Sequence, residues 1–157
     1  MSRAFVKDND GDTPEDLPDR PISKHPNFVT ATGLRMIEER VRALASEREL
    51  ARLAEEPSNV ARIGRELRYW QQRRSTARLV TPDAAAGKVR FGMRVTLQPH
   101  AGSALAFTLV GEDEADPAHG RISWASPLAQ QLLGREVGDE IVFNDLRYEI
   151  AAIEATG

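Results

Sequence analysis

The sequence of 157 residues contains no cysteine. Disulfide bonds and thiolate metal sites are therefore excluded, although the absence of cysteine does not by itself identify a cellular compartment. Long hydrophobic runs are also missing, because no stretch approaches the ~18 apolar residues that span a bilayer, and the N-terminus has no signal-peptide core. We expect a cytoplasmic protein that makes no contact with a membrane.

Catalytic and metal-binding patterns are equally scarce. The three histidines are scattered along the chain at His25, His100 and His119, without the spacing or the carboxylate partner of a zinc site. The string DNDGD at Asp8–Asp12 is similar to a calcium loop, but Thr13 stands where such a loop needs glycine. No Ser–His–Asp arrangement or phosphate-binding glycine loop is evident. We therefore expect that the chain is not an enzyme and has no cofactor of its own.

The net charge of −3 is unevenly distributed. Residues 1–29 carry six acidic and four basic side chains, residues 30–78 seven acidic and eleven basic, and residues 79–157 eleven acidic and six basic. The basic middle part lies either near phosphate or another anionic surface, or simply forms a solvated helix face.

Three segments follow one another along the chain. Residues 1–27 are rich in Asp and Pro and show no apolar period, which predicts an acidic, disordered tail. Residues 28–80 carry two heptad-like stripes separated by a break at Pro57, which predicts an antiparallel helical hairpin. Residues 81–157 read as a small antiparallel sheet with one short helix, so the expected fold class is α+β.

The two predicted helices have similar signals. Thr30 is a candidate N-cap for the first helix, and Ser58 for the second. The first stripe consists of Leu34, Ile37, Val41, Leu44 and Ala51, and the second of Val60, Ile63, Leu67, Trp70 and Ala77. A helix over Thr32–Glu56 would extend ~38 Å, so Glu55 and Glu56 are expected at the far end of the hairpin.

In the C-terminal segment, alternating apolar residues in KVRFGMRVTL predict a strand, and ALAFTLVG, RISW, EIVF and LRYEIAAIE are further candidates. Ser126 and Pro127 are typical of a helix start and Gly134 of a helix end. Tight turns are expected at Gly138-Asp139 and at Asn144-Asp145.

Four strings resemble one family. GKVRFGMRVTL (Gly87–Leu97), LVGEDEADPAHGRISWASPLAQQLLGREVGDEIV (Leu109–Val142) and YEIAAIE (Tyr148–Glu154) are similar to the C-terminal domain of the bacterial GreA/GreB transcription elongation factors. FVTATGLRMIEERV (Phe28–Val41) resembles the start of their coiled-coil domain. The resemblance covers roughly residues 28–157.

This resemblance implies a function. Members of the family bind RNA polymerase at the mouth of its secondary channel through an FKBP-like C-terminal domain and insert the coiled coil toward the active centre. Acidic residues at the tip help to hold a second Mg²⁺, and the polymerase then hydrolyses the 3′ end of a backtracked transcript. Two carboxylates at a helix turn can supply oxygen ligands to Mg²⁺, and a paired metal can activate the attacking water.

Several site residues follow from the resemblance. The tip candidates for a Mg²⁺ shared with the polymerase active centre are Glu55 and Glu56. The candidates for polymerase binding are Ser123, Ser126, Pro127, Asp113, Glu114 and Asp116. The last three can equally be ordinary turn residues. The candidates for contact with nascent RNA or the channel wall are Arg62, Arg65, Arg68 and Arg73, although Glu66 can pair with Arg62.

The sequence also departs from the family. The tip reads EEPSNVAR instead of a D-x-x-E-N-A-E-Y pattern, and the hairpin is shorter than in typical members by roughly ten residues per arm, or about 15 Å. The expected function is thus a Gre-like elongation factor that acts as a monomer, either assisting transcript cleavage or occupying the channel as an inhibitor. A third hypothesis is an interaction module similar to the regulators of nucleoside diphosphate kinase, whose coiled coil is much shortened.

Overall fold

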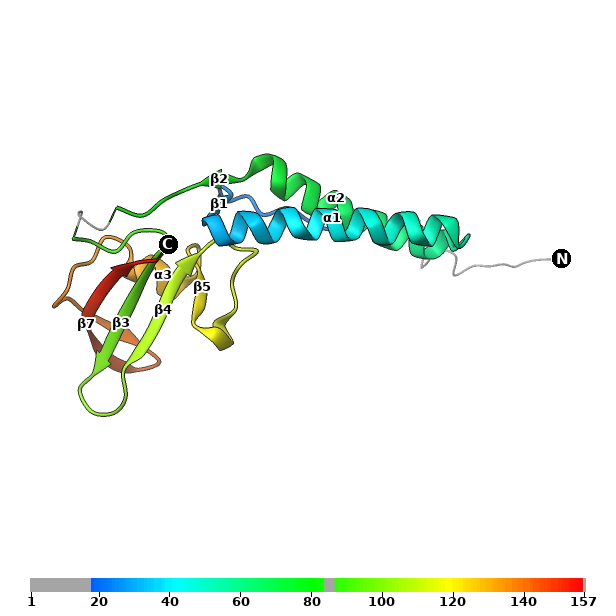
Figure 1. The fold of residues 1–157 in the computed structure, drawn as a ribbon. Coiled ribbons are helices and arrows are strands. Elements are labelled where there is room, and N and C mark those ends of the chain that lie inside the picture. The colour runs from blue at the N-terminus through cyan, green and yellow to red at the C-terminus, as the bar shows by residue number, and fades with distance from the viewer. Residues whose placement is uncertain (1–17, 84–86, 157) are drawn as a thin grey trace. The chain divides into compact units, whose positions relative to one another are not determined.

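The computed structural model describes residues 18–83 and 87–156 (Figure 1). The chain divides into two compact units. One contains Ile37–Thr76 and the described residues up to Lys24, and the other contains His25–Met36 and the described residues from Ala77 onward. The Asp8–Asp12 string and most of the predicted tail lie outside the described residues.

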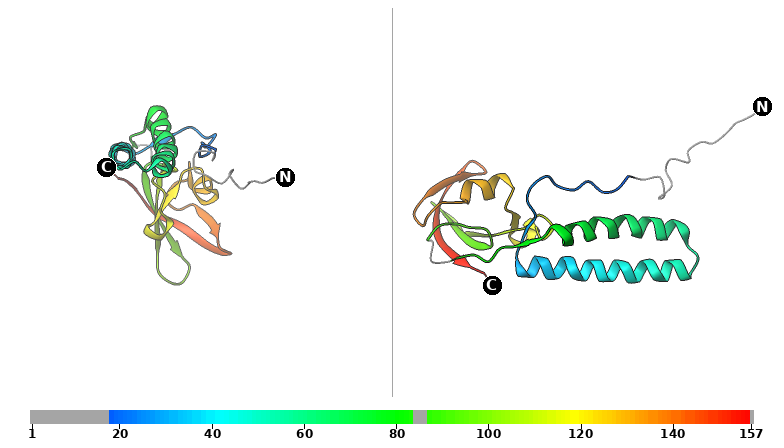
Figure 2. Two further views of the ribbon diagram at one scale, coloured as in Figure 1. Left: turned by 90° about the vertical axis from the view of Figure 1, so that its right-hand side faces the viewer. Right: turned by 90° about the horizontal axis from the view of Figure 1, so that it is seen from above.

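The first unit is built on a helical hairpin. Helix α1 spans Ala31–Leu53 and helix α2 spans Pro57–Thr76. The two helices run side by side in opposite directions, with the short connection at one end (Figures 1 and 2). The predicted stripes face each other in a cluster of buried side chains: Val41, Leu44, Ala51, Ile63 and Leu67, with Val60 and Trp70 against it. The predicted hairpin is confirmed, because each helix has one apolar stripe and the other helix covers it.

The start of α2 differs from the prediction. The helix begins at Pro57, and the backbone N–H of Val60 donates to the carbonyl oxygen of Glu56 at 2.9 Å. Glu56 therefore occupies the N-cap position and Ser58 lies within the first turn. The reason is the proline, whose fixed φ and missing N–H suit the first helical position.

The segment before the hairpin is not a free tail throughout. Residues 18–20 have no helix or strand, but they contact α2. Asp19 Oδ1 accepts a hydrogen bond from Arg68 Nε at 2.9 Å, and Arg20 Nη1 donates to Glu66 Oε1 at 2.8 Å. The prediction of a disordered tail is wrong for these residues, because the charges of α2 bind them.

In the second unit, the residues around the helix start are fixed by strands. Strands β1 (Phe28–Val29) and β2 (Arg78–Leu79) form a short parallel pair. The ring of Phe28 also packs against Trp124, with centroids 5.1 Å apart. These contacts explain why residues 25–36 belong to the same compact unit as the sheet. The sequence instead predicts that the hairpin domain comprises residues 28–80. The predicted N-cap is confirmed, since Thr30 Oγ1 accepts a hydrogen bond from Gly33 N at 2.9 Å.

The core of the second unit is a five-stranded sheet with the order β5-β4-β3-β7-β6. Its strands are β3 (Met93–Pro99), β4 (Leu105–Val110), β5 (Arg121–Ser123), β6 (Glu140–Phe143) and β7 (Leu146–Ala155). The α+β class is confirmed, but the sheet is mixed and not purely antiparallel, because β4 and β5 pair in parallel. The connection between them, which includes the 3₁₀ turn η5 (Pro117–His119), is long enough to bring the chain back in the same direction.

The alternating pattern of KVRFGMRVTL correctly predicts burial, although the strand is shorter than the string. Val89 and Phe91 are buried, but β3 begins only at Met93. Gly92 precedes it with φ 86°, a left-handed conformation that interrupts an extended strand. The predicted tight turn is confirmed at Asn144 and Asp145, whose φ values are 52° and 64°.

Helix α3 (Pro127–Leu132) covers the sheet with Leu128, Ala129 and Leu132, which belong to the same buried cluster as Val95 and Ile150. Within residues 18–83 and 87–156, no helix is both long and apolar enough to cross a membrane.

Candidate functional site

The tip of the hairpin has a defined backbone motif. Glu56 N donates to the carbonyl oxygen of Ala51 at 3.0 Å, and Glu55 N donates to that of Arg52 at 3.1 Å. This pair of bonds is the Schellman arrangement, in which the residue after the helix adopts a left-handed conformation. Glu55 takes that position with φ 58°, where glycine is usual. The backbone of Glu55 is therefore mildly strained, because a residue with a side chain takes the position that favours glycine.

The carboxylate of Glu56 has partners within its own helix. Its Oε1 accepts a hydrogen bond from Asn59 Nδ2 at 3.0 Å, and Asn59 Oδ1 accepts one from Arg62 Nη2 at 3.0 Å. Arg52, one turn before the tip, is engaged by Glu49, and its hydrogen bond lowers the pKa of the Glu49 carboxyl. The positive charge of Arg52 is therefore paired with Glu49 and not with the tip glutamates.

The tip offers two carboxylates for a metal. Among the described residues, no group of three or more His, Cys, Asp or Glu side chains could hold a metal ion. Mg²⁺ requires six oxygen ligands in near-octahedral geometry, so the pair of glutamates would need ligands from another molecule.

The arginines of α2 do not all share one surface. Arg62, Arg65 and Arg68 follow one another at three-residue spacing and form what we call the arginine face. Arg73, in contrast, is 1% exposed. Arg73 is therefore not part of the arginine face, because its side chain is buried.

Glu66 also has a different partner from the one expected. Its Oε1 lies 2.8 Å from Arg20 Nη1, and its Oε2 lies 3.7 Å from Arg65 Nη1. Arg62 bonds to Asn59 instead. The expected pair of Arg62 and Glu66 is thus replaced, because the segment before the hairpin supplies a competing cation.

The loop before α3 uses its serines to shape the backbone. Ser123 Oγ accepts a hydrogen bond from Ala125 N at 3.1 Å, and Ser126 Oγ accepts one from Ala129 N at 3.3 Å. Ser126 is therefore the N-cap of α3, as predicted, with Pro127 at the first helical position. Pro127 is exposed, whereas Ser123 and Ser126 are half-buried. Of these three side chains, that of Pro127 is the most accessible to solvent.

Asp116 belongs to the turn around η5. Its Oδ2 lies 2.7 Å from His119 Nδ1 and accepts a hydrogen bond from Arg121 Nη2 at 3.3 Å. The carboxylate therefore helps to hold the turn that leads into β5. Asp113 lies three residues earlier in the same half-buried loop.

Glu114 joins this loop to the start of α1. Its Oε1 accepts a hydrogen bond from Thr30 Oγ1 at 2.5 Å, and the same hydroxyl caps Gly33 N. A Cβ atom at Gly33 would lie 2.7 Å from Glu114 Oε1, so the glycine leaves room for the carboxylate. The negative charge also suits the positive end of the helix dipole. For Glu114, these contacts favour a structural role over an open acidic patch.

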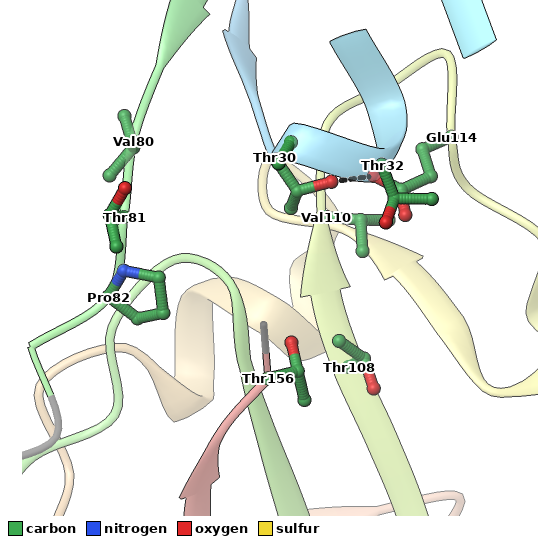
Figure 3. A pocket seen from close by; sticks show the side chains of 10 residues that line it. Thr30, Thr32, Val80, Thr81, Pro82, Thr108, Val110, Glu114 and Thr156 are labelled. Carbon is green, nitrogen blue, oxygen red and sulfur yellow. Dashed lines mark hydrogen bonds between the residues drawn. The ribbon is translucent and has the colours of Figure 1, made fainter. Parts of the chain in front are cut away.

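Sequence reasoning missed a small cavity beside this contact (Figure 3). Its volume is about 230 Å³, and threonines from distant parts of the unit line it together with Val110, Pro82 and Glu114. These threonines are Thr30, Thr32, Thr81, Thr108 and Thr156. No sequence signal could have predicted the cavity, because its lining comes from α1, the segment after β2, β4 and the end of β7.

The match to a family model lies in the sheet unit. Residues 82–155 match the family model described as "Transcription elongation factor, GreA/GreB, C-term". The chain is 39% identical over 97 residues to the transcription elongation factor GreA of Desulfovibrio desulfuricans, which covers 58% of this chain and 60% of that protein. It is 41% identical over 95 residues to GreA of Nitratidesulfovibrio vulgaris, which covers 57% of this chain and 59% of that protein.

Among solved structures, the prokaryotic transcription elongation factor GreA/GreB from Nitrosomonas europaea is 19% identical, with a TM-score of 0.42 over 82% of this chain and 98% of that chain. A likeness of this size carries no argument about function.

The matched segment forms the mixed five-stranded sheet and the capped helix α3. The helical hairpin precedes it in the chain. Residues 82–155 form a C-terminal domain of the GreA/GreB type. The chain thus contains a domain that matches the C-terminal part of the GreA/GreB transcription elongation factors, and its listed curated relatives are named GreA. The chain spans about 60% of the length of the curated relatives that it matches.

Proposed function

We propose that this chain is a regulator of transcription elongation that binds RNA polymerase through its GreA/GreB-type domain and places the α1–α2 hairpin in the secondary channel. The observation that carries the proposal is the family match over residues 82–155, together with relatives named GreA elongation factors. The hairpin, with helices of 23 and 20 residues, supplies the second part that a channel-binding factor needs.

The chain acts in the channel mainly by occupying it. Helices α1 and α2 extend about 34 Å and 30 Å. The resemblance implies that each arm is shorter than in typical family members by roughly ten residues, or about 15 Å. A carboxylate ligates Mg²⁺ only at about 2.1 Å, so a tip that stops several ångströms short contributes nothing to a shared metal. The chain then blocks access to the channel without promoting transcript cleavage.

The competing version of this function gives the tip a chemical role. Glu55 and Glu56 would then complete the ligands of a second Mg²⁺ in the polymerase active centre, where the metal would activate the water that attacks the phosphodiester. In both versions, the arginine face contacts nascent RNA or the channel wall.

Docking on the polymerase involves the loop around Pro127. This proline is exposed beside the half-buried Ser123 and Ser126, and Asp113 and Asp116 lie in the neighbouring part of the matched segment. The alternative role as a regulator of nucleoside diphosphate kinase implies a much shortened coiled coil. Two helices of 23 and 20 residues favour the polymerase instead.

A backtracked polymerase complex with end-labelled RNA and Mg²⁺ tests the proposal. We expect the chain to co-migrate with the complex without releasing short 3′ fragments. Fragments that disappear in the Glu55→Gly/Glu56→Gln variant would establish assisted cleavage and contradict occupancy alone. The glycine is chosen because it keeps the left-handed backbone at position 55 without strain.

The docking surface is tested in the same assay. Pro127→Ala should weaken co-migration, whereas Gln131→Ala, an exposed change on the same helix, should leave it unchanged. A chain that never associates with the polymerase would contradict the proposal as a whole.

A further inference from the structure

The first described residues form a strap on helix α2, consisting of Pro18, Asp19 and Arg20. The carbonyl oxygen of Pro18 accepts a hydrogen bond from Arg65 Nε at 2.5 Å. Asp19 Oδ1 accepts bonds from Arg68, at 2.9 Å from Nε and 2.8 Å from Nη2. Arg20 bonds to Glu66 and lies over Tyr69, with Cζ 3.8 Å from the ring centroid.

The strap occupies two of the three cations of the arginine face. Arg65 and Arg68 each donate to a strap oxygen, whereas Arg62 is held by Asn59 within the helix. The contacts are made at the surface, since the side chains of Asp19 and Arg68 are 64% and 56% exposed. Ion pairs this exposed are weak and are screened by salt, so another anion can displace them.

The strap shares two features with a nucleotide. It places two oxygen acceptors on successive arginines and a flat, delocalised guanidinium on the face of a tyrosine ring. A single strand of nucleic acid offers the same combination, with phosphate oxygens for the arginines and a base to stack on the aromatic ring. Nucleic acid supplies the oxygens and a flat group in every repeating unit, whereas an acidic peptide places a flat group on Tyr69 only where an arginine or aromatic residue falls in register, so the contacts favour nucleic acid.

The hollow next to the strap extends this surface. It is lined by Asp19, Arg20 and Ile22 on one side and by Arg68, Tyr69, Gln71, Gln72 and Ser75 on the other. The amide and hydroxyl groups of α2 are hydrogen-bonding partners for the edge of a stacked base. The surface thus combines charge, a stacking platform and polar groups on one helix.

Helix α2 is strongly basic, and the strap brings one carboxylate and one backbone carbonyl oxygen to it. Helix α2 contains five Arg and one Glu, so its side chains sum to +4. The strap is also tethered, because β1 begins only eight residues after Arg20, and a tethered ligand competes at a high effective concentration.

We propose that the strap is an intramolecular mimic of single-stranded RNA, which occupies Arg65, Arg68 and Tyr69 and must leave before α2 can bind a transcript. This inference deepens the proposed function, since the arginine face is one of its RNA contacts. It regulates that contact by competition, so that the isolated protein binds RNA more weakly than its arginine face allows.

The test uses the full chain and a fluorescent oligouridylate of about 20 nucleotides, with anisotropy measured at low salt. The variant Asp19→Asn/Arg20→Gln removes both side-chain contacts of the strap without changing the net charge. The matched control is Arg42→Gln/Glu47→Gln, two exposed residues of α1 whose combined change is also neutral. We expect the strap variant to bind the RNA roughly threefold to tenfold more tightly than the natural chain and the control.

A second set of variants locates the site. Adding Arg65→Gln/Arg68→Gln to the strap variant should abolish the gain and reduce the slope of log K against log salt by about 1.4. An unchanged affinity of the strap variant, or an equal gain in the control, would overturn the proposal. An equal gain for a polyglutamate peptide would overturn the assignment of RNA as the ligand.

These outcomes do not depend on the polymerase. A strap variant that gains RNA affinity but never associates with a polymerase complex would leave this inference standing and contradict the proposed function. A chain that co-migrates with the polymerase but shows no gain from releasing the strap would do the reverse.

Discussion

At the scale of single residues, the structure requires glycine at one position and tolerates a larger residue at another. A Cβ atom at Gly111 would lie 2.4 Å from the carbonyl oxygen of Phe28, which is backbone and cannot move aside cheaply. A Cβ atom at Gly64 in α2 would meet only the ends of Arg48 and Arg68, at 3.8 Å and 3.7 Å. Gly111 is thus required by packing, whereas Gly64 is not.

We therefore predict opposite effects for the two glycine-to-alanine substitutions. Gly111→Ala should lower the free energy of unfolding by about 2–3 kcal/mol, because β1 and the end of β4 must separate. Gly64→Ala should raise it by up to about 1 kcal/mol, because alanine is the better helix former. Urea unfolding measures both. Equal effects of the two substitutions would show that Phe28 does not approach Gly111.

Residue types with strong local preferences were predictable from the sequence, and contacts between distant residues were not. Thr30 and Ser126 cap their helices as predicted, because a hydroxyl at the N-cap needs only the next turn of backbone. The partner of Glu114 is Thr30, 84 positions away, and no local rule indicates it. The burial of Arg73 was also missed, because the helical spacing from Trp70 to Ala77 places position 74, and not 73, in the apolar stripe.

At the scale of elements, the heptad stripes hold the hairpin together. Leu67 is 4% exposed in the cluster between α1 and α2, whereas Leu50 on the outer side of α1 is 66% exposed. The same chemical group therefore lies in two environments within one unit. Burial against the partner helix, and not helix propensity, is what stabilises these helices.

We expect Leu67→Ala to cost about 2–4 kcal/mol of unfolding free energy, since it removes buried methyl groups and leaves a cavity. Leu50→Ala should change the same quantity by less than about 0.5 kcal/mol. The two tryptophans allow each unit to be followed separately, with Trp70 packed against the hairpin cluster and Trp124 beside Phe28 in the other unit. A background with Trp124→Phe reports the hairpin alone. Comparable losses for both leucine variants would contradict the observed packing.

The elements themselves were largely predictable, and their pairing was less so. Periods of 3.6 and 2 gave the two long helices and most strands, because one buried face imposes each period. The parallel pairing of β4 with β5 could not be predicted, since a short strand such as RIS fits either direction. The two-residue strands β1 and β2 are too short to have any period.

At the scale of the whole molecule, a helical hairpin with a strap on its basic helix precedes a GreA/GreB-type domain in the chain. The family resemblance could be recognised from the sequence, because the characteristic motifs follow one another closely within residues 82–155. The strap was not readable, because Asp- and Pro-rich segments are normally disordered and the contacts of Asp19 depend on α2.

The most direct test of the central claim is a competition measurement on a backtracked polymerase complex. A GreA protein that stimulates transcript cleavage is mixed with increasing amounts of this chain, and the rate of 3′ fragment release is followed. If the chain binds the channel without completing the metal site, the rate falls toward that of the polymerase alone as the chain saturates the complex. A rate that stays constant or rises would contradict the account, because the chain would then either not bind the channel or itself support cleavage.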